Sequence, residues 1–435
     1  MTSSADPPRE FAVSVVRQLR DAGFQALWAG GCVRDALMGK VPKDYDVASN
    51  ATPDQVIELF GERRTVPVGA AFGVVMVLGP TRAAGQIEVA AFRSDGEYHD
   101  GRRPGSVRFC SPAEDAQRRD FTINGMFFDP LDNHVIDFVG GQEDLVAGIV
   151  RAIGNPAQRF AEDKLRMLRA VRFAATMGFE IDSDTSAAVL QQHRTLRVVS
   201  VERISQELRR MLAHVSRERA FQLLWQTRLL VEVMPELFPP ESAHDDVINP
   251  IVAAVVDVLM GLELDRFEPA LAAILIEFHR QRTRTRSLPP AEIVECVCRR
   301  LRLSNDELRC ILWLIESLKF AQQMSLQPLH VQKPLLADER ILLLIDLLQA
   351  LEGREGQIAD NAAFCRQRLQ ELPAETLNPS PLLDGRDLQQ LGIPPGKQMG
   401  RLLRQIRQEQ LDELLRDRAA AVQRIQELWS ATADE

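Results

Sequence analysis

Long hydrophobic runs, cysteine and an excess of positive charge are all scarce in this 435-residue sequence. The longest apolar runs, such as 251–256 and 270–276, fall far short of the roughly 20 residues that span a bilayer, so no membrane helix is expected. The N-terminus has neither a basic start nor an apolar segment, which predicts a cytoplasmic protein without a signal peptide. A net charge of −9 argues against a protein that coats nucleic acid with its whole surface.

The six cysteines follow neither a disulfide framework nor the spacing of a zinc site. Only Cys296 and Cys298 stand close together, and no second pair of Cys or His accompanies them, so we expect thiols that pack as small hydrophobes. The remaining composition is globular, with 45% hydrophobic and 26% charged residues. We therefore expect a chain of several domains that folds without an obligate protein partner.

The first part of the chain predicts a sheet-containing domain, and the rest predicts helices. Short apolar runs broken by Gly, Pro and Asp predict strands at 26–30, 44–48, 73–78 and 87–92. Helices are predicted between them at 33–38 and 53–60. After Gly154 the apolar residues recur every three or four positions, which predicts an almost entirely helical remainder.

The motif GGCVRD lies between the first predicted strand and the helix that follows it. Its paired glycines, Gly30 and Gly31, would let the backbone come close to a phosphate. Arg34 adds the side chain that is best suited to two-point phosphate binding. A glycine pair after a strand is by itself more often a tight turn, so the motif needs support from its neighbours.

Three acidic residues on predicted strands provide this support. Asp44 and Asp46 stand two apart in the predicted strand at 44–48, so their carboxylates would leave from one face. Glu88 lies in the later strand QIEVAAF. Carboxylates held together repel one another unless a cation lies between them, and Mg²⁺ is the usual one. An Asp-x-Asp pair is most often a surface feature, but beside a phosphate loop it predicts metal-assisted transfer at phosphorus.

A third motif, EDAQRRDFTING, follows the predicted strands. Arg119 would clamp a triphosphate while Asp120 and Asn124 fix the loop. A helix end with ordinary surface charge is compatible with the same residues.

The fourth motif, FAEDKLRMLRAVRFA, has charged residues at every third position. These residues are Asp163, Arg166, Arg169 and Arg172, and on a helix the first three share one broad face. A salt-bridged amphipathic helix has the same pattern. However, the segment 151–210 contains eleven Lys and Arg against seven Asp and Glu in an acidic chain, so we expect an anionic or polar partner.

In this order and spacing the motifs resemble those of class II tRNA nucleotidyltransferases, the CCA-adding enzymes, and of the related bacterial poly(A) polymerases. The resemblance is close from 26 to 181, in GGCVRD, PKDYDVASNATPDQV, TVPVGAAFG, EYHDGRRP, EDAQRRDFTING and EDKLRMLRAVRFA. It implies an α+β fold that begins with a small mixed-sheet nucleotidyltransferase head of the polymerase β type. The implied domains are this catalytic head (1–153), a helical neck (154–215), a helical body (216–330) and a helical, RNA-binding tail (331–435).

The resemblance also implies roles for the motif residues. Asp44 and Asp46 would be catalytic and bind Mg²⁺, with Glu88 as the third acid. The nucleotide would be bound by Gly30, Gly31, Arg34, Arg119, Asp120, Asn124, Asp163, Arg166, Arg169 and Arg172. Among these, Asp163 and Arg166 would replace a template base. An aspartate accepts from the exocyclic amine of C or A and an arginine donates to the ring nitrogen, whereas G and U present the opposite pattern.

The activity implied by the resemblance is addition of CMP and AMP, from CTP and ATP, to the 3′ end of tRNA, with release of pyrophosphate. Two alternatives stay open: a poly(A) polymerase that uses ATP alone, and a partial tRNA nucleotidyltransferase that adds only CC or only A. CC-adding relatives have a shortened loop, whereas 93–115 is full length here, which favours addition of the terminal A. The intact acids argue against a third hypothesis, an inactive RNA-binding module, since adjacent carboxylates repel without a metal.

Overall fold

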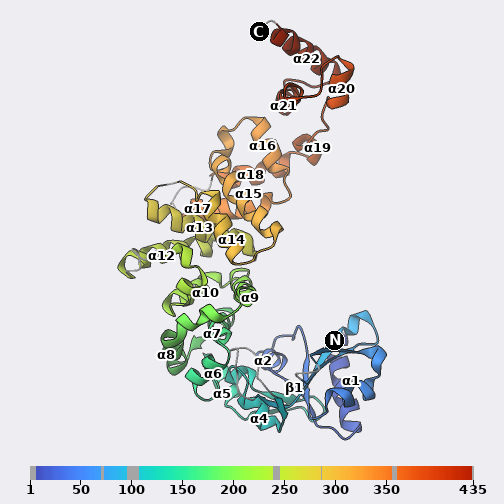
Figure 1. The fold of residues 1–435 in the computed structure, drawn as a ribbon, viewed down its shortest axis with the longest axis vertical. Helices are drawn as coiled ribbons and strands as arrows, with labels where there is room; N and C mark the ends of the chain where they lie inside the picture. The colour runs from blue at the N-terminus through green and yellow to red at the C-terminus, as the bar shows by residue number, and fades with distance from the viewer. Residues whose placement is uncertain are drawn as a thin grey trace. The chain divides into compact units, whose positions relative to one another are not determined.

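The computed structural model describes residues 6–69, 73–95, 107–238, 245–285, 287–354 and 360–433. Of the loop 93–115, residues 96–106 lie outside the described residues, and so does the whole motif EYHDGRRP. The chain divides into two compact units (Figure 1). The first comprises Met1–Met211 and Arg219–Phe238, and the second comprises Leu212–Glu218 and Pro239–Glu435.

A seven-stranded mixed sheet with the order β3-β4-β5-β2-β1-β8-β9 lies at the centre of the first unit. Its strands are β1 (Ala26–Ala29), β2 (Asp46–Ser49), β3 (Thr65–Gly69), β4 (Val74–Leu78), β5 (Gln86–Ala91), β8 (Phe127–Asp129) and β9 (His134–Ile136). Strands β2 and β5 run parallel, and the other neighbours are antiparallel. All four predicted strands are present, which confirms the mixed-sheet head.

Helices cover both faces of this sheet because side chains alternate along each strand. Val47 and Val89 join residues of α1 (Pro7–Asp21) and α3 (Pro53–Phe60) in one buried cluster. Ala48 packs on the other face with Ala116 of α4 (Pro112–Gln117). The other elements of the head are α2 (Gly31–Leu37), η1 (Glu62–Arg64), η3 (Arg82–Ala84), β6 (Arg93–Asp95), β7 (Val107–Phe109), η4 (Thr122–Asn124) and α5 (Gly141–Ala147).

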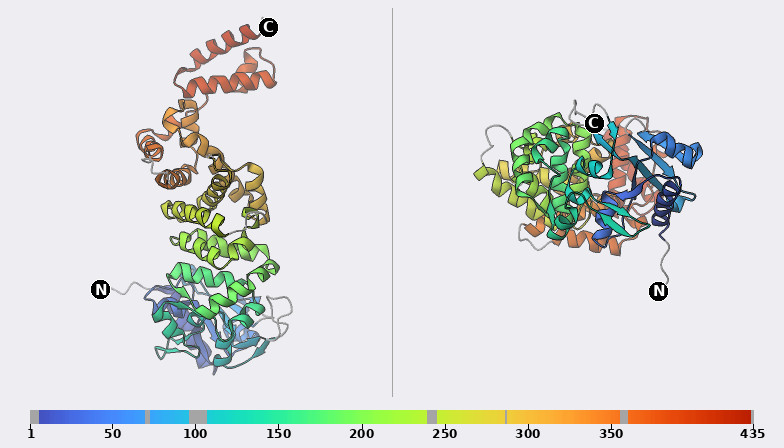
Figure 2. Two further views of the ribbon diagram at one scale, coloured as in Figure 1. Left: turned by 90° about the vertical axis from the view of Figure 1, so that its left-hand side faces the viewer. Right: turned by 90° about the horizontal axis from the view of Figure 1, so that it is seen from below.

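After the head the chain is helical, as expected, apart from one short strand. Strand β10 (Ile149–Val150) pairs in parallel with β11 (Glu180–Ile181), inside the stretch that was predicted to be helical. The helices are α6 (Pro156–Glu162), α7 (Leu165–Met177), α8 (Ser183–Gln192), η5 (His193–Val198), α9 (Val201–Leu212), α10 (Arg217–Gln226), α11 (Leu229–Val233) and η6 (Pro235–Leu237). A buried cluster that includes Phe121, Val150 and Phe173 packs α7 against the loop that follows α4. In the left view of Figure 2, the layer of helices that contains α7 lies against the head, and the helices that follow it lie farther away.

The second unit is helical throughout its described residues. Its remaining elements are α12 (Asp245–Gly261), α13 (Phe267–Thr283), α14 (Ala291–Arg300), α15 (Asn305–Ala321), η8 (Met324–Leu326), α16 (Leu329–Leu336), α17 (Ile341–Arg354), α18 (Asp360–Glu371), α19 (Ala374–Leu377), α20 (Gly385–Gln390), α21 (Lys397–Leu411) and α22 (Arg418–Ala433). The buried carboxylate of Asp346 on α17 accepts from the backbone N–H groups of Glu263 and Leu264, at 2.7 and 3.2 Å. None of the described helices has the length and apolarity needed to cross a membrane. The predicted borders of neck, body and tail stay predictions.

Candidate functional site

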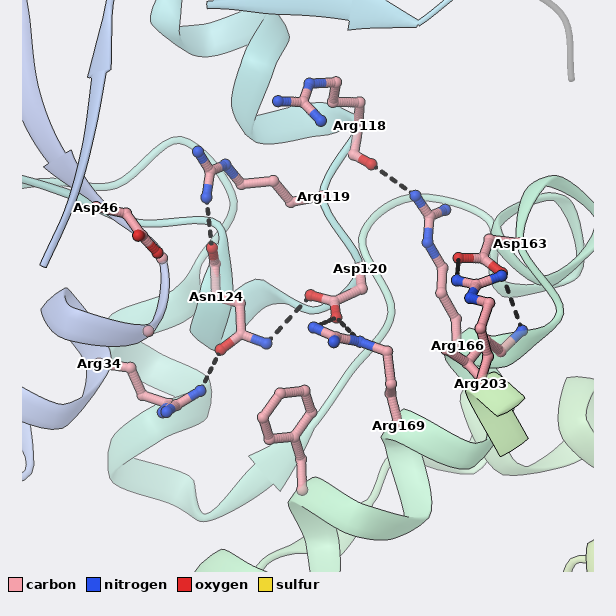
Figure 3. A pocket seen from close by; sticks show the side chains of 14 residues that line it. Arg34, Asp46, Arg118, Arg119, Asp120, Asn124, Asp163, Arg166, Arg169 and Arg203 are labelled. Atoms are coloured by element: carbon pink, nitrogen blue, oxygen red, sulfur yellow. Dashed lines mark hydrogen bonds and ion pairs between the residues drawn. The ribbon is translucent and has the colours of Figure 1, made fainter. Parts of the chain in front are cut away.

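A pocket of about 460 Å³ lies in the first unit, where α2, the loop after α4 and the start of α7 meet (Figure 3). Ten of the thirteen predicted site residues line it, and the three that do not are Asp44, Glu88 and Arg172. Six arginines and three aspartates contribute to the lining. The pocket therefore has an excess of positive charge, which suits a polyanionic ligand.

The two glycines keep one side of this pocket open. Gly30 has a φ of 74°, a conformation that residues with a Cβ rarely adopt. A Cβ on Gly30 would also lie only 3.0 Å from Nη1 of Arg119. Gly31 is the first residue of α2, and both glycines line the pocket. A larger residue at position 30 would displace an arginine from the site.

The acidic edge of the site is formed where β2 and β5 run side by side. Asp46, the first residue of β2, is in register with Glu88 of β5, and alternation places both on the face of the sheet that α4 covers. The protein atoms around Asp46 exclude water and raise its pKa to about 6, and the charges of Glu88 and Asp44 act in the same direction. Arg119 opposes this rise. The three carboxylates therefore act on one another at this edge, and Arg119 is the positive charge that acts on Asp46.

Asp44 was predicted to lie in the strand, and this was wrong. No neighbouring strand pairs with the chain before Asp46, so β2 begins there and Asp44 lies in an exposed bend. Tyr45 and Val47 nevertheless both enter the core under the sheet. The alternation thus extends beyond the hydrogen-bonded strand, and the charge of Asp44 still reaches Asp46.

Arg119 is held in the pocket by a carboxylate that the sequence analysis did not select, that of Asp115. Nε and Nη2 of Arg119 donate to Oδ2 of Asp115 at 3.1 and 2.9 Å. Nε and Nη2 of Arg118 donate to Oδ1 at 2.9 and 2.7 Å. Burial tends to raise the pKa of Asp115, but the two arginines hold it below its ordinary value. One buried carboxylate therefore orients two arginines of the pocket.

A chain of hydrogen bonds connects α2, the loop after α4 and α7 (Figure 3). Nη1 of Arg34 donates to Oδ1 of Asn124 at 2.6 Å, and Nδ2 of Asn124 donates to Oδ1 of Asp120 at 3.1 Å. Nε of Arg169 donates to the other oxygen of Asp120 at 2.7 Å. Burial tends to raise the pKa of Asp120, but Arg169 and Asn124 lower it to about 2. Asp120 is therefore the ionised centre of this chain.

The helix predicted through the fourth motif is broken at Asp163, so the prediction that Asp163 shares a helix face with Arg166 and Arg169 was wrong. Helix α6 ends at Glu162, Asp163 is extended with φ −138° and ψ 104°, and α7 begins at Leu165. Oδ1 of Asp163 accepts from the N–H of Leu165 at 3.1 Å, which favours the break. The carboxylate lines the pocket from this corner.

Both residues of the predicted base-selecting pair are held by further contacts. Nη1 and Nη2 of Arg203 donate to the two oxygens of Asp163. Nη1 of Arg166 donates to the carbonyl oxygen of Arg159 at 3.1 Å and to Glu162 at 2.7 Å. Nη2 of Arg166 donates to the carbonyl oxygen of Arg118 at 2.9 Å. The side chains of this pair are therefore positioned before any ligand binds.

Arg172, predicted to contact the nucleotide, does not line the pocket. Its Nε donates to Glu207 at 2.5 Å, and burial lowers its pKa. Phe173 and Arg203 do line the pocket and were missed. The sequence could have indicated both residues, since Phe173 lies within the fourth motif and Arg203 within the basic segment 151–210.

A second group of possible metal ligands lies on the hairpin of β8 and β9. Asp129, Asp132 and His134 offer oxygen and nitrogen atoms within reach of one another. Arg20 forms ion pairs with both aspartates. The negative charge of these two aspartates is therefore already paired with Arg20.

Three family models match the chain. They are the poly(A) polymerase head domain at 26–151, a probable RNA- and SrmB-binding site of polymerase A at 178–239, and a putative tRNA nucleotidyltransferase domain 2 at 287–425. The CCA-adding enzyme of Enterococcus faecalis is 33% identical over 417 residues, 94% of each chain. The CCA-adding enzyme of Bacillus subtilis is 43% identical over 223 residues, which are 51% of this chain and 55% of that enzyme.

Solved structures agree with these sequence matches. The Bacillus stearothermophilus CCA-adding enzyme in complex with CTP superposes with a TM-score of 0.78 at 25% identity, covering 98% of this chain and all of that one. The Thermotoga maritima CCA-adding enzyme complexed with tRNA has the same fold, with a TM-score of 0.62 at 21% identity over 97% of this chain and 95% of that one. This chain belongs to the CCA-adding enzyme family of nucleotidyltransferases.

Proposed function

We propose that this protein adds CMP and AMP, taken from CTP and ATP, to the 3′ end of tRNA and releases pyrophosphate. The observation that carries the proposal is that one arginine-rich pocket joins the acidic edge at Asp46 to the pair Asp163 and Arg166. The match of 287–425 to a tRNA nucleotidyltransferase domain favours tRNA over an RNA that receives a poly(A) tail. The reaction is attack by the tRNA 3′-hydroxyl oxygen on the α-phosphorus, with cleavage of the bond to pyrophosphate.

Base selection follows from the hydrogen-bonding capacity that Asp163 and Arg166 retain. Oδ1 of Asp163 accepts two hydrogen bonds and Oδ2 accepts one, so one lone pair of Oδ2 can accept from an exocyclic amine. Arg166 uses three of its five N–H groups, and the other two donate to no residue in the described part of the chain. The free acceptor on Asp163 and the free donors on Arg166 match the exocyclic amine and the ring nitrogen of C and A. G and U present the opposite groups, so both residues would be left unpaired.

The phosphates of the nucleotide would lie among the guanidinium groups of the pocket. Arg119 and Arg34 are each fixed by a hydrogen-bonded partner, so little conformational entropy is lost when they bind an anion. Arg169 is fixed in the same way by Asp120. Gly30 and Gly31 leave room beside Arg119 and Arg34 for the ligand.

Asp44, Asp46 and Glu88 fit a divalent cation. They offer the oxygen ligands that Mg²⁺ requires, and burial together with the charges of Glu88 and Asp44 raises the pKa of Asp46, so a cation there would relieve their repulsion. We expect Asp44 and Asp46 to hold Mg²⁺ and Glu88 to support them. When bound there, Mg²⁺ supplies Lewis-acid chemistry at the attacking hydroxyl and the departing phosphate.

The proposal extends to the remaining domains. The head (1–153) would carry out catalysis, the neck (154–215) would select the nucleotide, and the body (216–330) and tail (331–435) would position the tRNA, with the tail in contact with RNA. Because its substrate would be tRNA, we place the enzyme in the cytoplasm.

The test is incorporation into one tRNA that lacks its 3′ CCA, with Mg²⁺ and either CTP alone, ATP alone or both, resolved at single-nucleotide length. Two additions with CTP and three with both nucleotides, followed by a stop, support CCA addition. Two additions without a terminal A would mean a CC-adding enzyme. No addition to this tRNA, with one A added to a second tRNA that already ends in CC, would mean an A-adding enzyme. A long tail from ATP alone, with CTP ignored, would mean a poly(A) polymerase.

A further inference from the structure

Three arginine side chains gather around the ring of Phe173. The Cζ atoms of Arg34 and Arg169 each lie 5.2 Å from the ring centroid, and Cζ of Arg172 lies 4.0 Å from it. All three distances are within the range of cation–π attraction. The arginines come from two elements far apart in the sequence, α2 and α7. Phe173 is therefore a common contact for cations that would otherwise only repel one another.

The ring itself is held firmly. Phe173 is 5% exposed and packs edge-on against Phe121, with ring centroids 5.8 Å apart at 79°. It belongs to the buried cluster that also contains Val150 and Ala170. The ring nevertheless lines the pocket. It is thus a rigid aromatic surface at the wall of a cationic site.

Arg34 and Arg169 are held from two sides. Asn124 accepts from Arg34, and Asp120 accepts from Arg169. Asp35 also accepts from Nε and Nη2 of Arg34, at 2.9 and 2.6 Å, so these polar bonds hold the edges of both guanidinium groups. Contact with the negative face of the Phe173 ring supplies the second restraint.

We propose that Phe173 is a positioning residue whose ring holds the guanidinium groups of Arg34 and Arg169 in place for the phosphates of the incoming nucleotide. The inference rests on the proposed function, since that function makes a nucleoside triphosphate the ligand. Phe173 touches no reacting atom and acts through the two arginines. The cation–π attraction, rather than the bulk of the ring, is the property that positions them.

A series of fluorinated phenylalanines at position 173 separates attraction from bulk. One, two and three fluorine atoms withdraw electron density from the ring face while changing its size little. If the ring attracts the arginines, KM for CTP and ATP rises with each added fluorine and reaches about ten times the wild-type value with three, while kcat changes less. The melting temperature should stay nearly constant. A KM that is flat across the series would overturn the proposal, because the ring would then only fill space.

A matched pair of variants tests the same point with ordinary residues. Phe173→Leu and Phe121→Leu each remove one ring of the same cluster, but only Phe173 faces arginines of the pocket. Both variants should lower the melting temperature. Phe173→Leu should raise KM for the nucleotides more than Phe121→Leu does, because only Phe173 contacts the arginines. An equal rise in KM for Phe121→Leu would contradict the inference.

Binding of inorganic tripolyphosphate to the full chain, measured by calorimetry, keeps this inference separate from the proposed function. Its dissociation constant should rise along the fluorinated series. If the protein incorporates neither CMP nor AMP but tripolyphosphate binding still follows the series, the proposed function fails and the role of Phe173 stands. If incorporation is normal and neither KM nor tripolyphosphate binding responds to fluorine, the role of Phe173 fails and the function stands.

Discussion

The two oxygens of Asp163 face the two terminal nitrogens of Arg203, with Nη1–Oδ1 at 3.1 Å and Nη2–Oδ2 at 2.8 Å. The residues are forty positions apart, and they bring the break between α6 and α7 against α9. A two-point pair of this kind fixes the plane of a carboxylate. Arg203 therefore controls the direction in which Asp163 presents its remaining lone pair.

This pair predicts separate effects for its two members. Asp163→Ala should mainly weaken discrimination against UTP and GTP, because the acceptor for an exocyclic amine is lost. Arg203→Lys should weaken discrimination less, by about tenfold, since an ammonium replaces the two-point contact with a single point. The readout is the ratio of kcat/KM for CTP to that for UTP. Arg197→Lys, which changes an exposed arginine paired with Glu232, is the control. Unchanged discrimination in Asp163→Ala would refute the template role.

Substitution of the acidic edge should abolish activity without loss of RNA binding. Asp44→Ala and Asp46→Ala should each lower incorporation of both nucleotides by about a thousandfold, because several kcal/mol of metal-derived stabilisation would be lost. Binding of tRNA, measured by filter retention, should change little. EDTA should inactivate the wild-type protein and excess Mg²⁺ should restore it. Asp132→Ala, an exposed acid of the same head, is the control. Turnover retained by Asp46→Ala would show that the metal lies elsewhere.

Asp115→Asn should raise KM for both nucleotides, because an amide cannot hold Arg118 and Arg119 in two forks at once. Stability should fall by about 3 kcal/mol, since two half-buried guanidinium groups lose the charge that they share. Asp129→Asn removes another buried carboxylate that is paired with an arginine, outside the pocket. It should lower stability while leaving KM unchanged. If both variants raise KM equally, Asp115 has no specific role in the site.

The lowered pKa of Asp120 predicts a loss of stability in acid. Its pKa is about 2 in the folded protein against an ordinary value of 3.8. The ionised form therefore contributes about 2 kcal/mol of stability at neutral pH, and this contribution is lost as the pH falls through 4 toward 2. Urea unfolding of wild type and Asp120→Asn at pH 7, 5 and 3 measures it. The difference between the two proteins should shrink as the pH falls, and a constant difference would contradict the assignment.

Gly141→Ala should destabilise the head by about 1–3 kcal/mol. The added Cβ would collide with the carbonyl oxygen of Thr122 and lie 2.7 Å from Cγ of Met126, and a backbone oxygen cannot easily yield. Gly353→Ala is the matched control, because no atom lies within 4 Å of its Cβ position in helix α17. It should stabilise the protein by about 0.5–1 kcal/mol. Thermal unfolding measures both, and equal effects would rule out the steric explanation.

Local sequence patterns predicted four of the seven strands of the main sheet, β1, β2, β4 and β5, and the helices α2 and α3. Apolar and polar side chains alternate around Val47 and around Val89, and this pattern predicts a strand at each place whatever its neighbour in the sheet, because strand side chains alternate with a period of two. Thr52 and Gln55 form the capping box of α3, a bonding pattern contained within four residues. The motifs around Gly30, Asp46, Arg119 and Asp163 likewise pointed to residues that line one pocket.

Where local patterns failed, a distant contact decided the outcome. Asp44 lies outside the strand because neither β1 nor β5 pairs with the chain before Asp46, although β5 itself begins at Gln86, and whether two segments pair is not encoded in one segment's own residues. Asp163 interrupts a helical pattern because its carboxylate bonds the N–H of Leu165 and Arg203. Arg172 turns from the pocket to Glu207, thirty-five residues away.

The sequence by itself determined four strands and two helices of the head, the helical character of the rest, and most of the acids and arginines that line the pocket. These depend on periodicity, capping and composition, which act over a few residues. Only the tertiary structure decided that Arg203 holds Asp163, that Asp120 pairs with Arg169 and that Arg34 reaches the ring of Phe173. Such contacts join segments whose separation along the chain carries no local signal, and they form only when the packed core brings those segments together.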